Sequence, residues 1–520
     1  MSTRSLLRST GVIGFATATS RVLGFIRDIL EAFFFGTTTA FQAFIVAFRI
    51  PNMLRDFVAE GATNAAFVPV LSEYLVTKGK EEFRRLSSVL LANLTLVLVA
   101  IVIVGSLAAP LIVRVIAPGL SADPANLELT VRLTRIVFSY ILLMGLAAYA
   151  MGVLNTLKHF SVPAFAPALL NISIIAAILI FRRNLTVVTL TMAVLVGGVL
   201  QLLIQIPVLR KKGISFSLPK TLAHPAAKRI LTLLVPRALG SAVYHVNILV
   251  DTMLASLYWI VGSGGIAALY YSYRLIQLPT AIFGTSLATA ALPTLSTHFA
   301  KKDMEGFRET LNISLKTLFL IMLPSTAGFI VLGNDIVRIL FERGEFTAYS
   351  TMITTQALVF YSIGLFSYAG IKILVFSFYS MQDTMTPVKT AATAMVINVL
   401  LNLILMWPLK LGGLALATSV AGICNFFILW HLLRKRIGSI AFKDTLGLIG
   451  KSACASVIMG SSLFIGTRYF NGLLPDKGIM VNASSLILLM AAGIVIYFVL
   501  LYLFRVKELS QVIRWISKTR

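Results

Sequence analysis

The sequence predicts an all-α polytopic membrane protein, and three observations carry this prediction. Hydrophobic residues make up 58% of the 520 residues and charged residues only 12%, with a mean hydropathy of +0.90. Soluble domains carry roughly twice that share of charged residues. The apolar residues form runs long enough to cross a bilayer as helices, and basic residues gather between alternate runs.

The apolar runs predict about fourteen membrane-spanning helices, because a helix needs roughly 20 apolar residues to cross the hydrocarbon core. In chain order they are expected at 10–35, 40–76, 86–116, 128–156, 163–181, 186–208, 228–261, 266–299, 310–341, 347–380, 387–408, 411–433, 446–468 and 482–504. An even number of spans leaves both termini on one side of the membrane.

The basic residues indicate which side that is. The formal net charge is +25, and Lys and Arg gather at 78–85, 210–212, 301–308, 434–436 and in the C-terminal tail. Loops rich in Lys and Arg face the cytoplasm, so both termini are expected there. Trp430 falls near the end of a span, as interfacial aromatic residues do. Because the basic residues are scattered between apolar runs and form no basic domain, we expect no nucleic-acid partner.

The same composition argues against a conventional enzyme and against an ATP-driven pump. Cys424 and Cys454 lie in apolar segments, so they predict neither a disulfide framework nor a metal-ligand cluster. The chain has no glycine-rich phosphate loop and no Ser/His/Asp grouping. The first apolar run continues past Arg21 without a small-residue cleavage site, so it is expected to be a retained span. No cofactor is expected.

The chain also repeats itself. A constant offset of 224 residues relates five landmarks: Pro69 to Pro293, Arg84 to Arg308, Pro163 to Pro387, Gly198 to Gly422, and 210–212 to 434–436. Six spans in each copy give both copies the same orientation, about an axis along the membrane normal. We therefore predict two six-helix lobes, 1–212 and 213–436, and a C-terminal region, 437–520, with two further helices and a cytoplasmic tail.

Charged and amide side chains lie inside three of the predicted spans: Arg21, Arg27, Asp28, Glu31, Arg49, Asn52, Arg55, Asp56, Glu60 and Arg274. A charge near the bilayer centre costs about 3 kcal/mol on insertion scales, so such residues normally face a bundle interior or a water-filled cavity. One explanation is local pairing, as between Arg27 and Glu31 at i, i+4, or snorkelling to the interface. The other is a polar chamber in which guanidinium groups bind a phosphate or diphosphate bidentately.

A second group of polar residues predicts a different ligand. Asp251 is the carboxylate of the seventh span, Asn398 and Asn402 are at i, i+4 on the eleventh, and Thr418 follows on the twelfth. A carboxylate with amide and hydroxyl oxygens can surround a hard cation. Hydrogen bonding between helices explains the same residues equally well.

Six motifs resemble one known family: Ser20-Arg-Val-Leu-Gly-Phe-Ile-Arg-Asp28, Pro51-Asn-Met-Leu-Arg55, Ala59-Glu-Gly-Ala62, Phe67-Val-Pro69, Pro163-Ala-Phe-Ala-Pro-Ala-Leu-Leu-Asn171 and Tyr270-Tyr-Ser-Tyr-Arg274. The chain resembles the MurJ (MviN) family of lipid II flippases, within the multidrug/oligosaccharidyl-lipid/polysaccharide exporter superfamily. The resemblance runs along nearly the whole chain.

The resemblance implies a transporter of the bacterial cytoplasmic (inner) membrane that works by alternating access. Its partners would be membrane lipids and lipid II, the undecaprenyl-diphosphate-linked peptidoglycan precursor, moved from the inner to the outer leaflet for cell-wall biogenesis. Cell-wall synthesis proteins are further expected partners. The driving force would be an ion gradient or the membrane potential, and the last two helices would form a groove for the lipid tail.

The resemblance also assigns residues. The substrate-binding residues that match the family's cavity residues are Ser20, Arg21, Arg27, Asp28, Asn52, Arg55 and Arg274. The residues that match a sodium site of some members are Asp251, Asn398, Asn402 and Thr418, with Na⁺ as the coupling ion. Gln42 and Gln277 stand where the family has acidic residues. This leaves the chamber more positive and puts in doubt any proton or salt-bridge step that used those carboxylates.

Three alternatives remain. A flippase for another undecaprenyl-linked glycan would share the chamber but not the three N-terminal motifs. A cation-coupled drug exporter of the same superfamily would favour carboxylates over guanidinium groups in its cavity. A membrane scaffold for cell-wall enzymes would have no need for charged residues inside its helices.

Overall fold

The computed structural model describes residues 3–55, 67–214, 219, 221–438, 442–473, 478–506 and 508. Every regular element within these ranges is helical, which confirms the predicted fold class. Internal contacts divide the chain into two compact units, Met1–Trp259 and Ile260–Arg520. The predicted boundaries at 212 and 436 concern the sequence repeat, and they stay a prediction.

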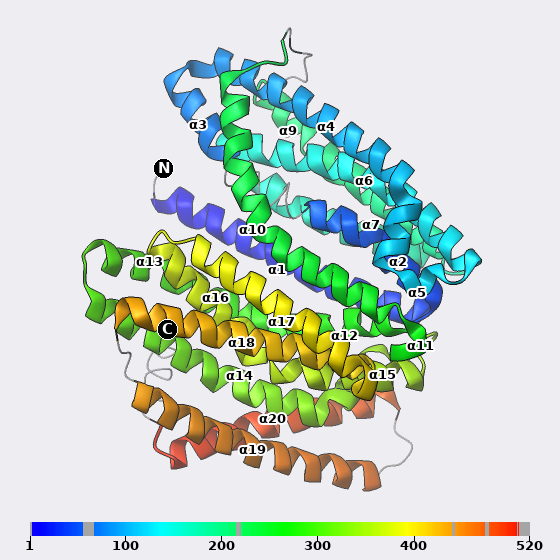
Figure 1. The fold of residues 1–520 in the computed structure, drawn as a ribbon, viewed down its shortest axis with the longest axis vertical. Helices are drawn as coiled ribbons and strands as arrows, with labels where there is room; N and C mark the ends of the chain where they lie inside the picture. The colour runs from blue at the N-terminus through cyan, green and yellow to red at the C-terminus, as the bar shows by residue number, and fades with distance from the viewer. Residues whose placement is uncertain are drawn as a thin grey trace. The chain divides into compact units, whose positions relative to one another are not determined.

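The first unit is coloured blue to green in Figure 1. Its helices are α1 (Thr3–Phe35), α2 (Thr39–Arg55), α3 (Val68–Thr77), α4 (Gly79–Ile116), α5 (Pro118–Ser121), α6 (Pro124–Thr156), α7 (Ser161–Ile180), α8 (Val187–Leu203), α9 (Ile206–Lys211) and α10 (Pro225–Ala255). The short helix α11 (Tyr258–Val261) lies at the division between the units.

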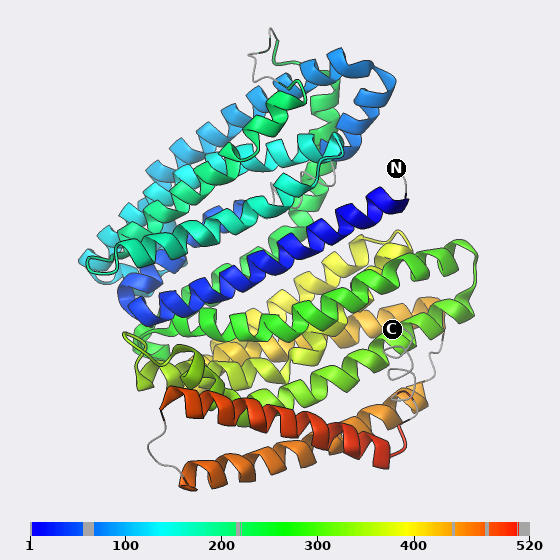
Figure 2. The same ribbon diagram turned by 180° about the vertical axis from the view of Figure 1, so that it is seen from behind.

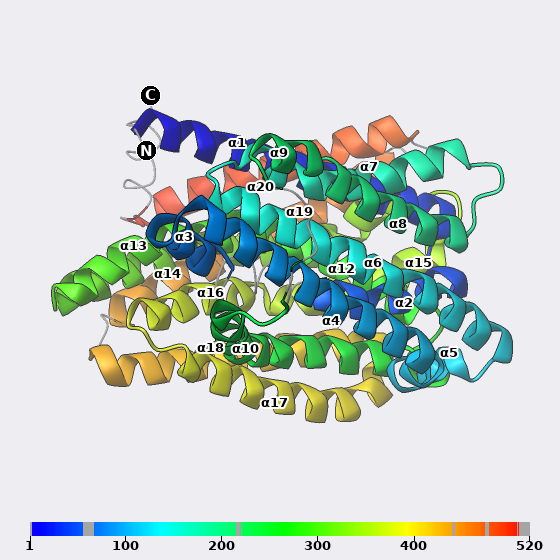
Figure 3. The ribbon, with the colours of Figure 1, turned by 90° about the horizontal axis from the view of Figure 1, so that it is seen from above.

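Packing in the first unit centres on α6, which contacts α2, α4 and α8. Figures 1 and 3 show α4 and α6 lying side by side along most of their length. α7 packs against both α1 and α8. Buried apolar residues such as Leu71, Phe83, Leu86, Val153 and Leu154 form one core cluster at the end of this bundle.

In its described residues, the second unit contains ten helical segments. They are α12 (Gly265–Pro279), the π-helix η2 (Thr280–Thr285), α13 (Ser286–Ala300), α14 (Met304–Phe341), α15 (Ala348–Ile363), α16 (Leu365–Ser380), α17 (Met385–Leu409), α18 (Leu411–Ile437), α19 (Phe442–Leu473) and α20 (Ile479–Leu503). Figure 2 shows the last two helices beside α14, which contacts both of them. Leu332, Met459, Leu463, Tyr497 and Leu501 belong to the apolar cluster between these three helices.

The helix pairings support the predicted internal repeat. In the first unit α7 packs on α8, α2 on α6, α3 on α4 and α6 on α8. At the matching places of the second unit, α17 packs on α18, α12 on α15, α13 on α14, and both α15 and α16 on α18. The same sequence landmarks therefore lead to the same pairings in the two halves.

Length and composition identify the membrane-crossing helices. Among the described residues, ten helices are long and apolar enough to span a membrane, or eleven if α15 and α16, bent by 46°, form one span. The predicted number of about fourteen is compatible with this result and stays a prediction. The bend occurs at Gly364, where a Cβ atom would lie 2.9 Å from the Cα of Ser419 on α18. Glycine therefore allows the two helices to approach closely at the bend.

A polar junction joins the start of α17 to the end of α18. Asp383 accepts hydrogen bonds from the Thr386 backbone N–H and hydroxyl, and Arg436 lies 2.5 Å from its carboxylate. Burial alone would raise the pKa of Asp383, but the hydrogen bonds from Thr386 and Arg436 outweigh it and hold that pKa below its ordinary value.

Candidate functional site

Arg27 is the centre of a buried polar cluster on α1. Its guanidinium donates to one carboxylate oxygen of Asp28, at 2.6 Å from Nη2 and 3.2 Å from Nε. Glu31, one turn further along, lies 3.5 Å from Nε, which confirms the pairing expected from the i, i+4 spacing. Arg27, Asp28 and Glu31 are only 9%, 3% and 2% exposed. One buried cation therefore contacts two buried carboxylates, and removing it would take a favourable ion-pair interaction from both of them.

Asn171 connects this cluster to α7. Its side-chain oxygen accepts a hydrogen bond from Nη1 of Arg27 at 3.1 Å, and its nitrogen donates to the Ser20 carbonyl at 3.0 Å. Gly24 lies opposite, and a Cβ atom there would sit 3.6 Å from the Asn171 side chain. The amide thus touches two successive turns of α1 and sets the direction of the Arg27 side chain. Asn171 ends one of the sequence motifs, but the sequence alone predicted no role for it.

The other predicted residues of α1 and α2 have different surroundings. Arg21 is exposed, whereas Ser20 and Asn52 are half-buried. Gln42 is 5% exposed. The side chain of Arg55 lies outside the described residues, as do Asp56 and Glu60.

Arg274, on α12, is the predicted binding-site cation of the second unit. Its Nη2 donates to the Tyr270 hydroxyl at 3.2 Å, and the guanidinium carbon lies 5.0 Å from the centre of the same ring. Its Nη1 donates to the Gln277 side-chain oxygen at 3.4 Å. Tyrosine and glutamine thus help to orient the Arg274 guanidinium, by one hydrogen bond each and by the face of the tyrosine ring.

A lysine lies close to the helix break that follows Arg274. Pro279 ends α12, and the chain continues as the π-helix Thr280–Thr285 before α13 begins. Nζ of Lys372, on α16, lies 2.7 Å from the Thr285 hydroxyl. Pro279 offers no N–H for the helical ladder, which explains the change of winding here. The sequence did not predict this contact.

Three residues of the predicted sodium group meet in the second unit. Asn402 donates to the Asn398 side-chain oxygen at 2.8 Å, and Asn398 donates to the Thr418 hydroxyl at 3.2 Å. These bonds tie α17 to α18, as polar residues between membrane helices do. Asp251 belongs to the first unit, where the Asn247 amide lies 3.3 Å from its carboxylate. The described part of the chain contains no cluster of three or more His, Cys, Asp or Glu residues suited to a metal ion.

Comparison with known proteins gives a consistent result. A family model described as lipid II flippase MurJ matches residues 32–503. The lipid II flippase MurJ of Burkholderia cenocepacia is 37% identical over 438 residues, covering 83% of this chain and 84% of the relative. A probable lipid II flippase MurJ of Rhizobium tropici is 33% identical over 524 residues, covering 99% and 97%.

Solved structures agree with the sequence comparison. A structure of lipid II flippase MurJ in an inward closed conformation matches with a TM-score of 0.79 and 28% identity, over 95% of this chain and 98% of that one. An inward-facing multidrug resistance transporter of the MATE family matches with a TM-score of 0.70 over 81% and 95%. At 16% identity, the second likeness shows the fold alone. On these matches, which extend over most of the chain, the protein belongs to the lipid II flippase MurJ family.

Proposed function

We propose that this protein moves lipid II from the inner to the outer leaflet of the bacterial cytoplasmic membrane and thereby supplies peptidoglycan synthesis. The observation that supports this most directly is membership of the lipid II flippase MurJ family, which extends over residues 32–503. The proposed process is movement of a lipid across the bilayer, without covalent chemistry.

The chemistry of the polar residues fits such a substrate. A diphosphate is a compact anion with several acceptor oxygens, and a guanidinium group can hold two of them at once. Arg21 is exposed and is proposed to contact the diphosphate directly. Ser20, which precedes it on α1, and Asn52 on α2 are included as binding residues on the sequence prediction. Arg274, held by Tyr270, is proposed to act as a second anion-binding group. Arg55 is included on the sequence prediction alone.

Arg27 is proposed to act differently. Asp28 and Glu31 already neutralise it, so an anion would gain its full attraction only when those contacts loosen. Such competition would make substrate affinity depend on the conformation of α1. A transporter requires this property, because a ligand shifts a conformational equilibrium only by its difference in affinity for the two states.

The driving force is proposed to be the membrane potential or an ion gradient. One charge that crosses 100 mV contributes about 2.3 kcal/mol. Na⁺ is proposed as the coupling ion, with the side-chain oxygens of Asn398, Asn402 and Thr418 in the second unit as candidate ligands. Replacing Na⁺ by choline in the transport assay tests this assignment. Unchanged transport without Na⁺ would show that Na⁺ is not the coupling ion.

The orientation follows from the basic loops. We propose that both termini lie in the cytoplasm, because Lys and Arg gather at 78–85, 210–212 and 434–436. A cysteine introduced at residue 2 should then react with a membrane-impermeant thiol reagent only after the membrane is made permeable. Labelling of this cysteine in intact cells would show that the N-terminus lies outside and would contradict the proposed orientation.

The decisive experiment measures lipid II in the outer leaflet of cells depleted of their own flippase. These cells express this protein, its Arg21→Ala variant or an Arg182→Ala control, which changes an exposed arginine between α7 and α8. We expect the wild type and the control to restore lipid II exposure and Arg21→Ala to fail, at matched membrane levels. If the wild type is present in the membrane but inactive, a different undecaprenyl-linked glycan becomes the better substrate.

A further inference from the structure

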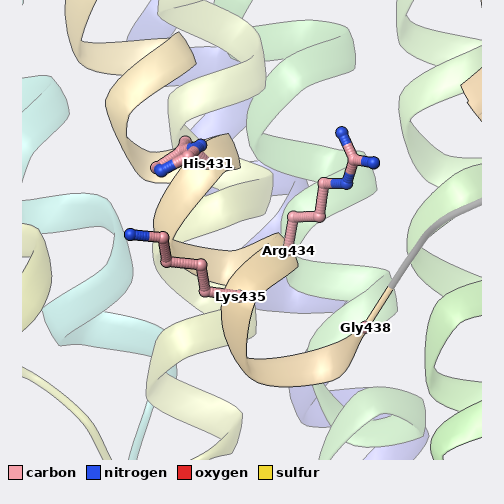
Figure 4. Close-up of a pocket in the computed structure, with 4 residues that line it drawn as sticks. All are labelled: His431, Arg434, Lys435 and Gly438. Atoms are coloured by element: carbon pink, nitrogen blue, oxygen red, sulfur yellow. The ribbon is translucent and has the colours of Figure 1, made fainter.

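The end of α18 carries a small basic pocket that the transport proposal does not use. His431, Arg434, Lys435 and Gly438 line a hollow of about 320 Å³. Figure 4 shows His431 and Lys435 on one side of the helix and Arg434 reaching to the other. All three side chains are exposed. Residues 431 and 435 are one turn apart and are therefore neighbours on the helix surface.

The other two cations near this helix end already have partners. Arg436 lies 2.5 Å from the Asp383 carboxylate and stacks over the Phe378 ring, with 5.4 Å between the guanidinium carbon and the ring centre. Arg308, on α14, donates from Nε to the Ile437 carbonyl at 2.6 Å. Because this bond covers a terminal carbonyl, it weakens the negative pole that α18 would otherwise present to an approaching anion.

The pocket itself keeps its positive charge. Within the described ranges, no carboxylate forms an ion pair with His431, Arg434 or Lys435. The same turn thus contains one arginine used for structure and two cations directed to solvent. Positive charge at this end of a membrane helix agrees with the topology rule. The preference of Lys and Arg for the cytoplasmic side does not by itself explain why His431, Arg434 and Lys435 line one hollow.

The position along α18 indicates what kind of anion would bind. The helix is apolar enough to cross the membrane from Leu411 to Ile437, so the pocket lies where the span ends. Phe427, one turn before His431 on the same face, is 53% exposed. Trp430 directly precedes His431 in the sequence, and tryptophan favours the headgroup level of a bilayer. A ligand at this place meets cations at one end and an apolar surface at the other.

We propose that this pocket binds the phosphate group of an anionic phospholipid in the leaflet at this end of α18, with an acyl chain along Phe427. The hollow is large enough for a phosphate headgroup, since small-molecule pockets begin at about 300 Å³. Basic residues next to a membrane span attract anionic headgroups in this way. The proposed ligand is a membrane lipid and not the transported substrate, so this inference does not depend on the proposed function.

The test uses the purified full-length protein, stripped of lipid in detergent and titrated with phosphatidylglycerol while native mass spectrometry counts the bound lipid. We expect the Arg434→Gln/Lys435→Gln variant to bind phosphatidylglycerol about thirtyfold more weakly than the wild type, given the usual contribution of two basic residues. The matched control is Lys301→Gln/Lys302→Gln, which removes the same charge from an exposed loop of the same unit. The control should bind like the wild type, and neutral phosphatidylcholine should not distinguish the proteins.

Further experiments distinguish binding of the whole lipid from binding of its headgroup alone, and binding at this pocket from general attraction to positive charge. Phe427→Ser should weaken binding of phosphatidylglycerol without changing the response to glycerol 1-phosphate. If glycerol 1-phosphate or inorganic phosphate binds as tightly as the lipid, the pocket is a soluble-anion site and the proposal is wrong. Equal loss in the Lys301/Lys302 control, or no loss in the Arg434/Lys435 variant, would also overturn it. Unchanged melting temperatures show that the variants are folded.

Discussion

Replacing Asn171 by alanine tests whether a single amide on α7 directs the buried arginine of α1. The change removes the acceptor of Arg27 Nη1, at 3.1 Å, and the donor to the Ser20 carbonyl, at 3.0 Å. A hydrogen bond to a charged group contributes about 1.5–3 kcal/mol, and a neutral one about 1 kcal/mol. Asp28 and Glu31 remain beside the guanidinium. The arginine should therefore stay buried but turn towards its carboxylates.

If the orientation of Arg27 matters for the substrate, the charged bond sets the size of the effect. A loss of 1.5–3 kcal/mol corresponds to roughly 10- to 150-fold weaker binding or slower transport. The assay is outer-leaflet lipid II per unit of folded protein, together with the dissociation constant of lipid II for the purified variant. Ile172→Ala is the matched control, because Ile172 is the next residue of α7 and is 44% exposed.

A purely structural role would give a different result. Asn171→Ala would then lower the melting temperature and the membrane level, while transport per folded molecule and lipid II affinity stayed at the wild-type value. That combination would refute the positioning role of Asn171. The reasoning also fails if Ile172→Ala reduces transport as strongly, since the effect would then not depend on the amide.

Three further predictions concern other parts of the chain. Tyr270→Phe removes the 3.2 Å hydrogen bond to Arg274 but keeps the ring beneath the guanidinium, so transport should fall by roughly tenfold or more, and further in Tyr270→Ala. Equal activity of both variants would contradict this. Gly413→Ala should lower the free energy of unfolding by about 1–3 kcal/mol, measured as a lower melting temperature, because its Cβ would lie only 2.1 Å from a main-chain carbonyl oxygen of α17. Asp383→Asn should lower the melting temperature at neutral pH. The folded protein holds the pKa of Asp383 below its ordinary value, so the stabilisation is present above the unfolded pKa of about 3.9 and lost as the pH falls through the lower folded value. The difference between wild type and variant should thus disappear under acid conditions, and a difference that is constant with pH would exclude the Arg436 ion pair as its cause.

The amino-acid sequence by itself determined where the helices are. The predicted span 163–181 is α7 (Ser161–Ile180), and the predicted span 310–341 ends with α14 at Phe341. This works because the thickness of the bilayer sets the length of an apolar run, whatever the neighbouring helices are. Contacts within one helix were also predictable, as the Arg27–Glu31 pair shows, since they depend only on helical spacing.

Breaks within the membrane-spanning helices were harder to predict from the sequence. The π-helix Thr280–Thr285 follows Pro279, and the bend between α15 and α16 follows a glycine, but neither residue alone distinguishes a break from a continuous helix. The predicted span 40–76 contains α2 and α3, and the predicted span 347–380 contains α15 and α16. The local sequence limits the backbone conformations that a segment can adopt, and packing against other helices determines which of them forms.

Only the tertiary structure decided which helix faces meet. Asn171 and Arg27 are 144 residues apart, and their contact depends on how α1 and α7 are rotated against each other. The contact of Lys372 with Thr285 and the pairing of Arg436 with Asp383 depend on packing in the same way. A sequence defines the faces of each helix through its periodicity, but the partner of each face follows from the packing of all helices together. For this reason the charged residues could be found from the sequence, whereas the contacts that hold each of them could not.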